Sequence, residues 1–135
     1  MRAKRLLLVS LVLAAACKPP TPAEEMDSVL SWIGTAGLAG NAWLRHSTPD
    51  TYTRQTLELS GKTLQQISKD LLESPPIAVD SAALDGVLTR THDRIMRMAE
   101  LIKGKDAPDF ARQLDSLRAD QKAIKALADS IESNQ

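Results

Sequence analysis

Cysteine, histidine and aromatic residues are scarce in this chain, and no charge of one sign dominates it. Cys17 is the only cysteine, which excludes an internal disulfide, a c-type haem motif and a thiolate metal site. Lysine and arginine together number 17, as do aspartate and glutamate. A chain with this balance and without a long basic run is not expected to have nucleic acid as a partner.

An apolar run from Leu6 to Ala16 follows the basic residues Arg2, Lys4 and Arg5. As a helix this run would cover roughly 16 Å, about half of a bilayer core, so it is too short to span a membrane. A basic start, a short apolar stretch and small residues before Cys17 form the pattern of a secretory signal peptide. We therefore predict that residues 1–16 are removed during export.

The stretch Leu13-Ala14-Ala15-Ala16-Cys17 resembles the lipobox of bacterial lipoprotein precursors, with Ala14 where that class prefers leucine. The resemblance implies that the signal is cut before Cys17 and that this residue carries acyl chains, which would hold the protein on a membrane. By the same resemblance, Lys18 implies sorting to the outer membrane, where the protein would face the periplasm. An ordinary cleavage after Ala16 is the alternative, because Ala14 and Ala16 also fit an Ala-x-Ala site.

Prolines mark the beginning of the mature chain. Residues 17–26 contain Pro19, Pro20 and Pro22, which favour an extended polyproline conformation, and we predict that they form a short tether. Removal of the basic signal leaves a mildly acidic mature chain, long enough for one domain with its own core. We predict this domain over residues 27–135.

Apolar residues recur at steps of three and four along the rest of the chain, which is the period of an amphipathic helix. Breaks that contain proline or glycine separate four such stretches. The predicted helices cover residues 27–46, 49–73, 80–103 and 107–132. Similar lengths and short loops predict an all-α fold, an antiparallel up-down-up-down four-helix bundle. Charged residues four apart, such as Asp93 and Arg97, are expected to pair on the solvent-facing sides.

The first predicted helix is unusually rich in glycine. Gly34, Gly37 and Gly40 would each weaken a helix by about 1 kcal/mol relative to alanine, so close approach of a neighbouring helix is expected to offset the loss. A kink between Gly34 and Gly40 is the alternative. The apolar arc of this helix is wider than one seam needs, and it comprises Leu30, Trp32, Ile33, Leu38, Trp43 and Leu44. We expect the surplus to offer a surface to an envelope protein partner.

Small or polar residues occupy the seam positions nearest to the middle of each predicted helix. They are Gly37, Ser60 or Gly61, Thr91 and Gln121. One interpretation is that Gln121 crosses the core to bond Thr91 or Ser60 and so fixes the register of the helices. The other is a small polar cavity that holds water or a ligand.

The two histidines are too far apart to share a metal ion. His46 is expected in the last turn of the first helix as a capping residue, and His92 near the middle of the third, roughly 15 Å away in height. The segment from His92 to Ala99 resembles the His/Met helix of ferritin-like periplasmic metal-binding bundles, with His92 and Met98 in the matching positions. Thr91 stands where the paired histidine of that class is expected, so the resemblance implies no metal site here.

Residues for nucleophilic catalysis are not arranged in a known pattern. No serine or threonine lies in a glycine-flanked elbow, and neither histidine has partners in a triad order. We therefore predict that the protein is not an enzyme and binds no cofactor. The prediction is a lipid-anchored envelope protein with a structural or protein-interaction role. The alternative is a periplasmic small-ligand or metal-binding helical bundle, which would need a polar cavity in its core.

Overall fold

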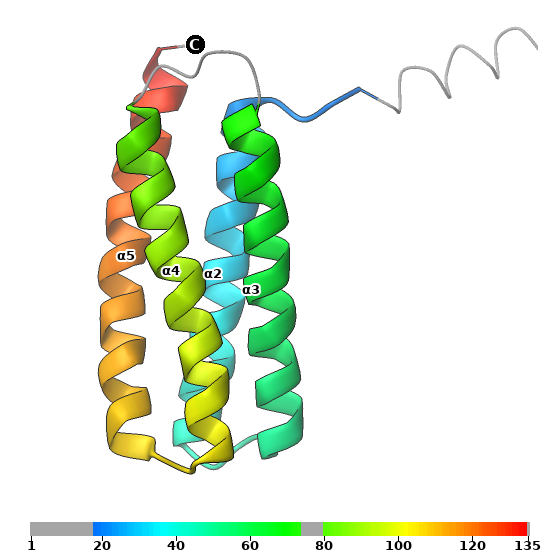
Figure 1. Cartoon of the computed structure of the whole chain (residues 1–135), viewed down its shortest axis with the longest axis vertical. Coiled ribbons are helices and arrows are strands. Elements are labelled where there is room, and N and C mark those ends of the chain that lie inside the picture. The colour runs from blue at the N-terminus through cyan, green and yellow to red at the C-terminus, as the bar shows by residue number, and fades with distance from the viewer. Residues whose placement is uncertain (1–17, 74–79, 135) are drawn as a thin grey trace, which may run out of the picture.

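The computed structural model describes residues 18–73 and 80–134. These residues form four helices and no strand: α2 (Pro22–Leu44), α3 (Asp50–Glu73), α4 (Ser81–Lys103) and α5 (Ala107–Ser133). The helices lie side by side as a bundle, with the α2–α3 and α4–α5 turns together at one end (Figure 1). The all-helical prediction is confirmed, whereas Cys17 and the signal segment lie outside the described residues.

The main error in the predicted boundaries is the start of the first helix. It begins at Pro22 rather than at residue 27, so residues 22–26 are helical and do not belong to the predicted tether. The reason is local: Thr21 is the N-cap, its hydroxyl accepts a hydrogen bond from the backbone N–H of Glu24 at 3.2 Å, and proline suits the first helical turn. The other three helices begin within one residue of the predicted positions.

The two turns that share one end of the bundle have the same construction. His46 follows the C-cap of α2 with φ 58°, and Lys105 follows the C-cap of α4 with φ 52°. Behind each of them, the next N–H bonds back into its helix, from Ser47 to the Ala42 carbonyl and from Asp106 to the Leu101 carbonyl. This is the Schellman arrangement, with a left-handed residue where glycine is usual. The predicted position of His46 inside the helix is therefore wrong.

Each helix packs against two neighbours, α2 and α4 each lying between α3 and α5. The buried core is almost entirely aliphatic, with Phe110 as its one fully buried aromatic ring among the described residues. Close approach is clearest at Gly61, where a Cβ atom would lie 2.6 Å from the sulfur of Met96, and at Gly40, where it would lie 3.2 Å from the Phe110 ring. Helix α2 runs without a break through its glycines.

Candidate functional site

The predicted polar layer in the middle of the bundle is not a network. The buried hydroxyl of Ser60 donates to the carbonyl of Thr56 at 2.8 Å, and that of Thr91 donates to the carbonyl of Val87 at 2.7 Å. Each hydroxyl is thus satisfied within its own helix. Among the described residues, no hydrogen bond joins Gln121 to either of them.

Gln121 lies in a different place from the one predicted. It is half-buried and lines a surface groove with Leu30 of α2, and its amide nitrogen is 3.9 Å from where a Cβ of Gly34 would lie. A Cβ at Gly37 would meet nothing within 4 Å. Both interpretations of Gln121, as a bridge across the core and as part of a polar cavity, are therefore wrong.

The buried polar residue of α5 is instead Asp120, one position earlier. Only 5 % of it is exposed, and its two carboxylate oxygens each accept one hydrogen bond from α4. Nε of Arg90 reaches Oδ1 at 3.1 Å, and Nε of Arg94 reaches Oδ2 at 2.8 Å. Arg94 also donates from Nη1 to the side-chain oxygen of Gln113 at 2.9 Å. One buried carboxylate thus holds two guanidinium groups over the seam between α4 and α5.

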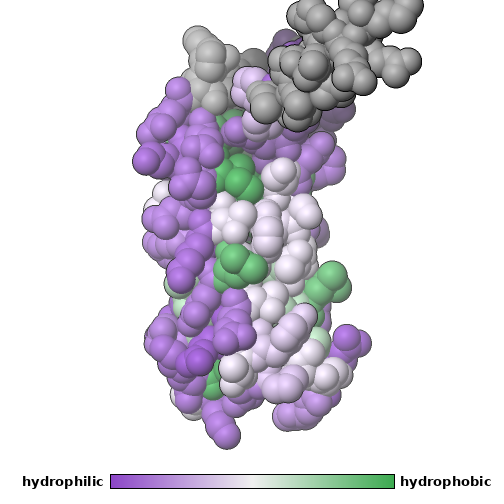
Figure 2. Space-filling model, turned by 90° about the vertical axis from the view of Figure 1, so that its right-hand side faces the viewer, coloured by the Kyte–Doolittle hydropathy of each residue, from purple (hydrophilic) through white to green (hydrophobic). Residues whose placement is uncertain are grey.

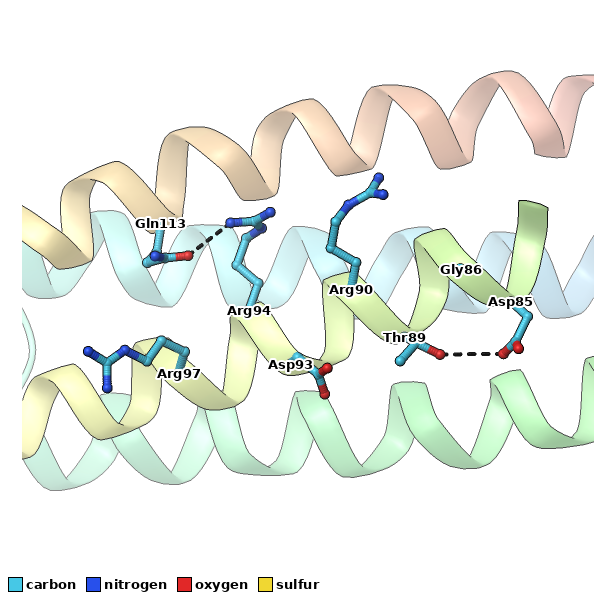
Figure 3. Close-up of a pocket in the computed structure, with 8 residues that line it drawn as sticks. All are labelled: Asp85, Gly86, Thr89, Arg90, Asp93, Arg94, Arg97 and Gln113. Carbon is cyan, nitrogen blue, oxygen red and sulfur yellow. Dashed lines mark hydrogen bonds between the residues drawn. The ribbon is translucent and has the colours of Figure 1, made fainter. Parts of the chain in front are cut away.

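A shallow groove of about 600 Å³ follows this seam, and Figure 3 shows its lining. Arg90 and Arg94 extend from α4 towards α5, and Arg97 comes next along the helix. Arg97 lies 3.7 Å from a carboxylate oxygen of Asp109, not beside Asp93 as predicted. Asp93 contacts Nδ1 of its neighbour His92 at 3.1 Å instead. The groove therefore combines three arginines from successive turns of one helix.

The turn end of the bundle holds a second, smaller cleft of about 310 Å³. It is lined by Trp43, Leu44, His46, Asp50, Lys105 and Ala107. Nε1 of Trp43 donates to Asp50 at 2.8 Å, and its ring lies 4.6 Å from that of Phe110. These contacts pack the partly buried Trp43 against this end of the core.

The opposite side of the molecule presents an uncharged surface along α2, whereas the neighbouring α3 carries charged residues such as Lys62 and Lys69. Helix α2 has no charged residue from Ser28 to Leu44. Its Leu38 is 73 % exposed, and the neighbouring helix α3 exposes Tyr52 and Leu59 to more than half of their surface. Figure 2 shows this side as a pale and green area that runs along the bundle beside a hydrophilic band. Of the predicted apolar arc, Ile33 lies in the core, whereas Leu38 is left to solvent.

A carboxyl group with one buried, unpartnered oxygen lies at the end of α2 that is far from the turns. Oε2 of Glu25 is buried and has no hydrogen-bond partner among the described residues. Burial, and to a smaller extent the negative charge of Asp70 on α3, raise the pKa of Glu25 above its ordinary value of 4.5. Asp70 itself accepts a hydrogen bond from Gln66.

In residues 18–73 and 80–134, no three histidine, cysteine or acidic side chains gather as a metal site would require. None of the four helices combines the length and the apolar character that crossing a bilayer needs.

Comparison with known proteins gives no relative from which a function could be transferred. No protein-family model matches the chain, and neither the curated proteins nor the solved structures contain a significant match. The functional conclusions below therefore come from the residues and their geometry.

Proposed function

We propose that this protein is a lipid-anchored protein of the bacterial envelope whose bundle binds another protein without catalysing a reaction. Residues 1–16 are its signal peptide, and acyl chains on Cys17 hold it at the periplasmic face of the outer membrane. The domain is an antiparallel up-down-up-down bundle. The observation that carries the proposal is the uncharged surface along α2, with Leu38 exposed at 73 %; the neighbouring helix α3 also exposes Leu59 and Tyr52.

Exposure of the apolar side chains of this surface to water costs free energy, and a bound protein partner would remove this cost. Covering exposed leucine and tyrosine side chains with a second apolar surface lowers the free energy by roughly 25 cal/mol for each Å² removed from water. The absence of charge from Ser28 to Leu44 also means that a partner can approach α2 without desolvating an ion. A partner of complementary chemistry has an apolar, uncharged face of its own.

The anchor and the domain are close together in the chain. Only Lys18 to Thr21 separate Cys17 from the first residue of α2. A lipid on Cys17 would therefore hold the end of the bundle opposite to the two turns next to the membrane. The uncharged surface would then rise from the bilayer along the length of α2, where a second envelope protein can reach it.

The carrier alternative receives less support from the core. Its buried hydroxyls have local partners: those of Ser60 and Thr91 donate to carbonyls of their own helices, and that of Thr53 contacts the Thr48 hydroxyl and the Pro49 carbonyl just before α3. Polar groups with free hydrogen-bonding capacity are what a ligand cavity would need. The surrounding core side chains that the structure describes are apolar.

The surface is tested with Leu38→Glu and with Ala126→Glu, which adds the same charge at an exposed position of α5. Both variants should unfold within about 0.5 kcal/mol of the unmodified protein, because neither changes the core. Chemical cross-linking in cells, followed by mass spectrometry, should reveal a partner that Leu38→Glu loses and Ala126→Glu keeps. Equal partner recovery from both variants would contradict a role for this face.

The anchor is tested separately in cells that express the full chain. Cys17→Ser should leave the bundle folded, because residue 17 precedes the first helix, but it should abolish the acyl chains and release the protein from the membrane fraction or block its processing. The mass of the N-terminal peptide of the unmodified protein should show the acyl groups. An unmodified Cys17, or membrane attachment that survives the substitution, would contradict lipidation.

A further inference from the structure

We propose that the arginine groove between α4 and α5 is a binding site for a phosphate-bearing ligand. The groove lies on α4 and α5 rather than on the α2–α3 surface, so this inference does not depend on the proposed protein partner. Its main residues are Arg90, Arg94 and Arg97, which follow one another along α4 at spacings of four and three. Such spacings bring side chains to one face of a helix.

On the α5 side of the groove, the arginines outnumber the carboxylates that pair with them, while Asp85 and Asp93 line its other side. Four guanidinium groups, of Arg90, Arg94, Arg97 and Arg112, share two carboxylates, those of Asp109 and Asp120. Asp109 is engaged by Arg112 at 2.9 Å, which leaves Arg97 at the longer distance of 3.7 Å. An anion that entered the groove would therefore meet arginine N–H groups that these two carboxylates leave unpaired.

The way in which Asp120 binds its two arginines leaves their outer edges available. Each arginine gives Asp120 only its Nε, so the carboxylate does not form the two-bond fork that arginine and carboxylate often make. Neither η nitrogen of Arg90 has a hydrogen-bond partner among the described residues, and Arg94 uses only Nη1, on Gln113. A phosphate group has several oxygens that can accept from such paired donors.

The buried Asp120 preorganises Arg90 and Arg94 for binding. A buried carboxylate that is hydrogen-bonded on both oxygens costs desolvation, and in return it fixes two long side chains that would otherwise lose rotamer freedom on binding. Arg94 is also mostly buried, whereas more than half of the Arg90 and Arg97 side chains is exposed to an incoming ligand. The structure thus combines a rigid support with accessible donors.

Two carboxylates line the other side of the groove and limit what can bind there. Asp85 and Asp93 extend from α4 towards α3, away from the guanidinium groups (Figure 3). Asp85 accepts a long hydrogen bond from Thr89, and Asp93 contacts His92. A ligand is therefore expected to place its phosphate on the α5 side of α4, where the arginines lie.

The experiment uses the full chain, purified in a neutral detergent and labelled with ¹⁵N. Inorganic phosphate is titrated in while the Nε–Hε signals of the arginines are followed by NMR, and mixed micelles that contain phosphatidic acid provide a lipid form of the same group. Saturable shifts should affect Arg90, Arg94 and Arg97. The double variant Arg90→Gln/Arg97→Gln should weaken binding about tenfold or more, which is the loss expected for charge-assisted hydrogen bonds.

The controls are Arg118→Gln and the double variant Arg118→Gln/Lys122→Gln; the second removes two positive charges outside the groove, as the test variant removes two within it. Both controls should bind phosphate as the unmodified protein does. Shifts with free phosphate, or with the lipid micelles alone, would both support the site and would identify a soluble or a headgroup ligand respectively. The absence of saturable shifts with either probe, or equal weakening by Arg118→Gln/Lys122→Gln and by Arg90→Gln/Arg97→Gln, would overturn the proposal.

Discussion

Two surfaces of this bundle, the α4–α5 seam and the outer face of α2, differ in their content of charged residues. Between α4 and α5, charges are abundant, and a buried carboxylate organises them: Asp120 holds Arg90 and Arg94 in place. Along α2 from Ser28 to Leu44, charge is absent, and Leu38 is left exposed. Both sides belong to one aliphatic core, so folding alone does not require the contrast. We therefore propose a different class of partner for each surface.

The largest expected effect comes from removing the carboxylate that organises the charged side. Asp120→Ala should lower the free energy of unfolding by about 3 kcal/mol, because it leaves Arg94 mostly buried without its charge partner. Asp115→Ala, which removes an exposed carboxylate paired with Arg118, should cost no more than about 0.5 kcal/mol. Urea unfolding of both variants measures the difference. Similar losses would show that Asp120 does not organise this seam.

A smaller change in stability is expected in the α2–α3 and α4–α5 turns. It should be equal in both, because the two turns have the same construction. His46→Gly and Lys105→Gly should each stabilise the protein by about 0.5–1 kcal/mol, because glycine adopts a left-handed conformation without the Cβ penalty. Arg45→Gly, at a C-cap with φ −87°, should give no such gain. Thermal unfolding of the three variants compares them. A gain in one turn but not in the other would mean that a side-chain contact of His46 or Lys105 outweighs the strain.

The smallest effect concerns Glu25, the charged group at the edge of the uncharged side. Because its pKa is raised, the folded state binds the proton more tightly than the unfolded chain, so stability falls as the pH rises from 4.5 through the raised pKa. Glu25→Gln should therefore raise the unfolding midpoint near neutral pH, and the gain should shrink as the pH falls towards 4.5. Glu24→Gln, at an exposed neighbour, is the control. A gain that is independent of pH would contradict the assignment to Glu25.

Much of the fold could be predicted from the sequence because its signals are local. Periodic apolar residues and breaks at proline and glycine placed the starts of α3, α4 and α5 within one residue. The start of α2 was missed because Pro19, Pro20 and Pro22 were interpreted together as an extended tether. The Thr21 cap, Pro22 and two glutamates in the first turn form a helix-start signal that outweighs this pattern.

The arginine groove could not be predicted in the same way, because its parts are distant in the sequence. The apolar periodicity of α5 placed Gln121 at the seam, whereas the buried polar residue is Asp120, one position earlier. Its partners Arg90 and Arg94 lie on another helix, 30 and 26 residues away. The spacing of Arg90, Arg94 and Arg97 on one face of α4 is the signal that could have indicated the groove. The lipid anchor and the protein partner remain predictions.

The most direct test of the central proposal is site-specific photo-cross-linking in living cells. A photoreactive amino acid at position 38 should give one discrete adduct with an envelope protein, and the same amino acid at position 126 on α5 should give none. The account predicts that Cys17→Ser reduces the adduct at position 38, because the protein then leaves the membrane. No discrete adduct at position 38, or equal adducts at both positions, would contradict a specific partner on the α2–α3 side.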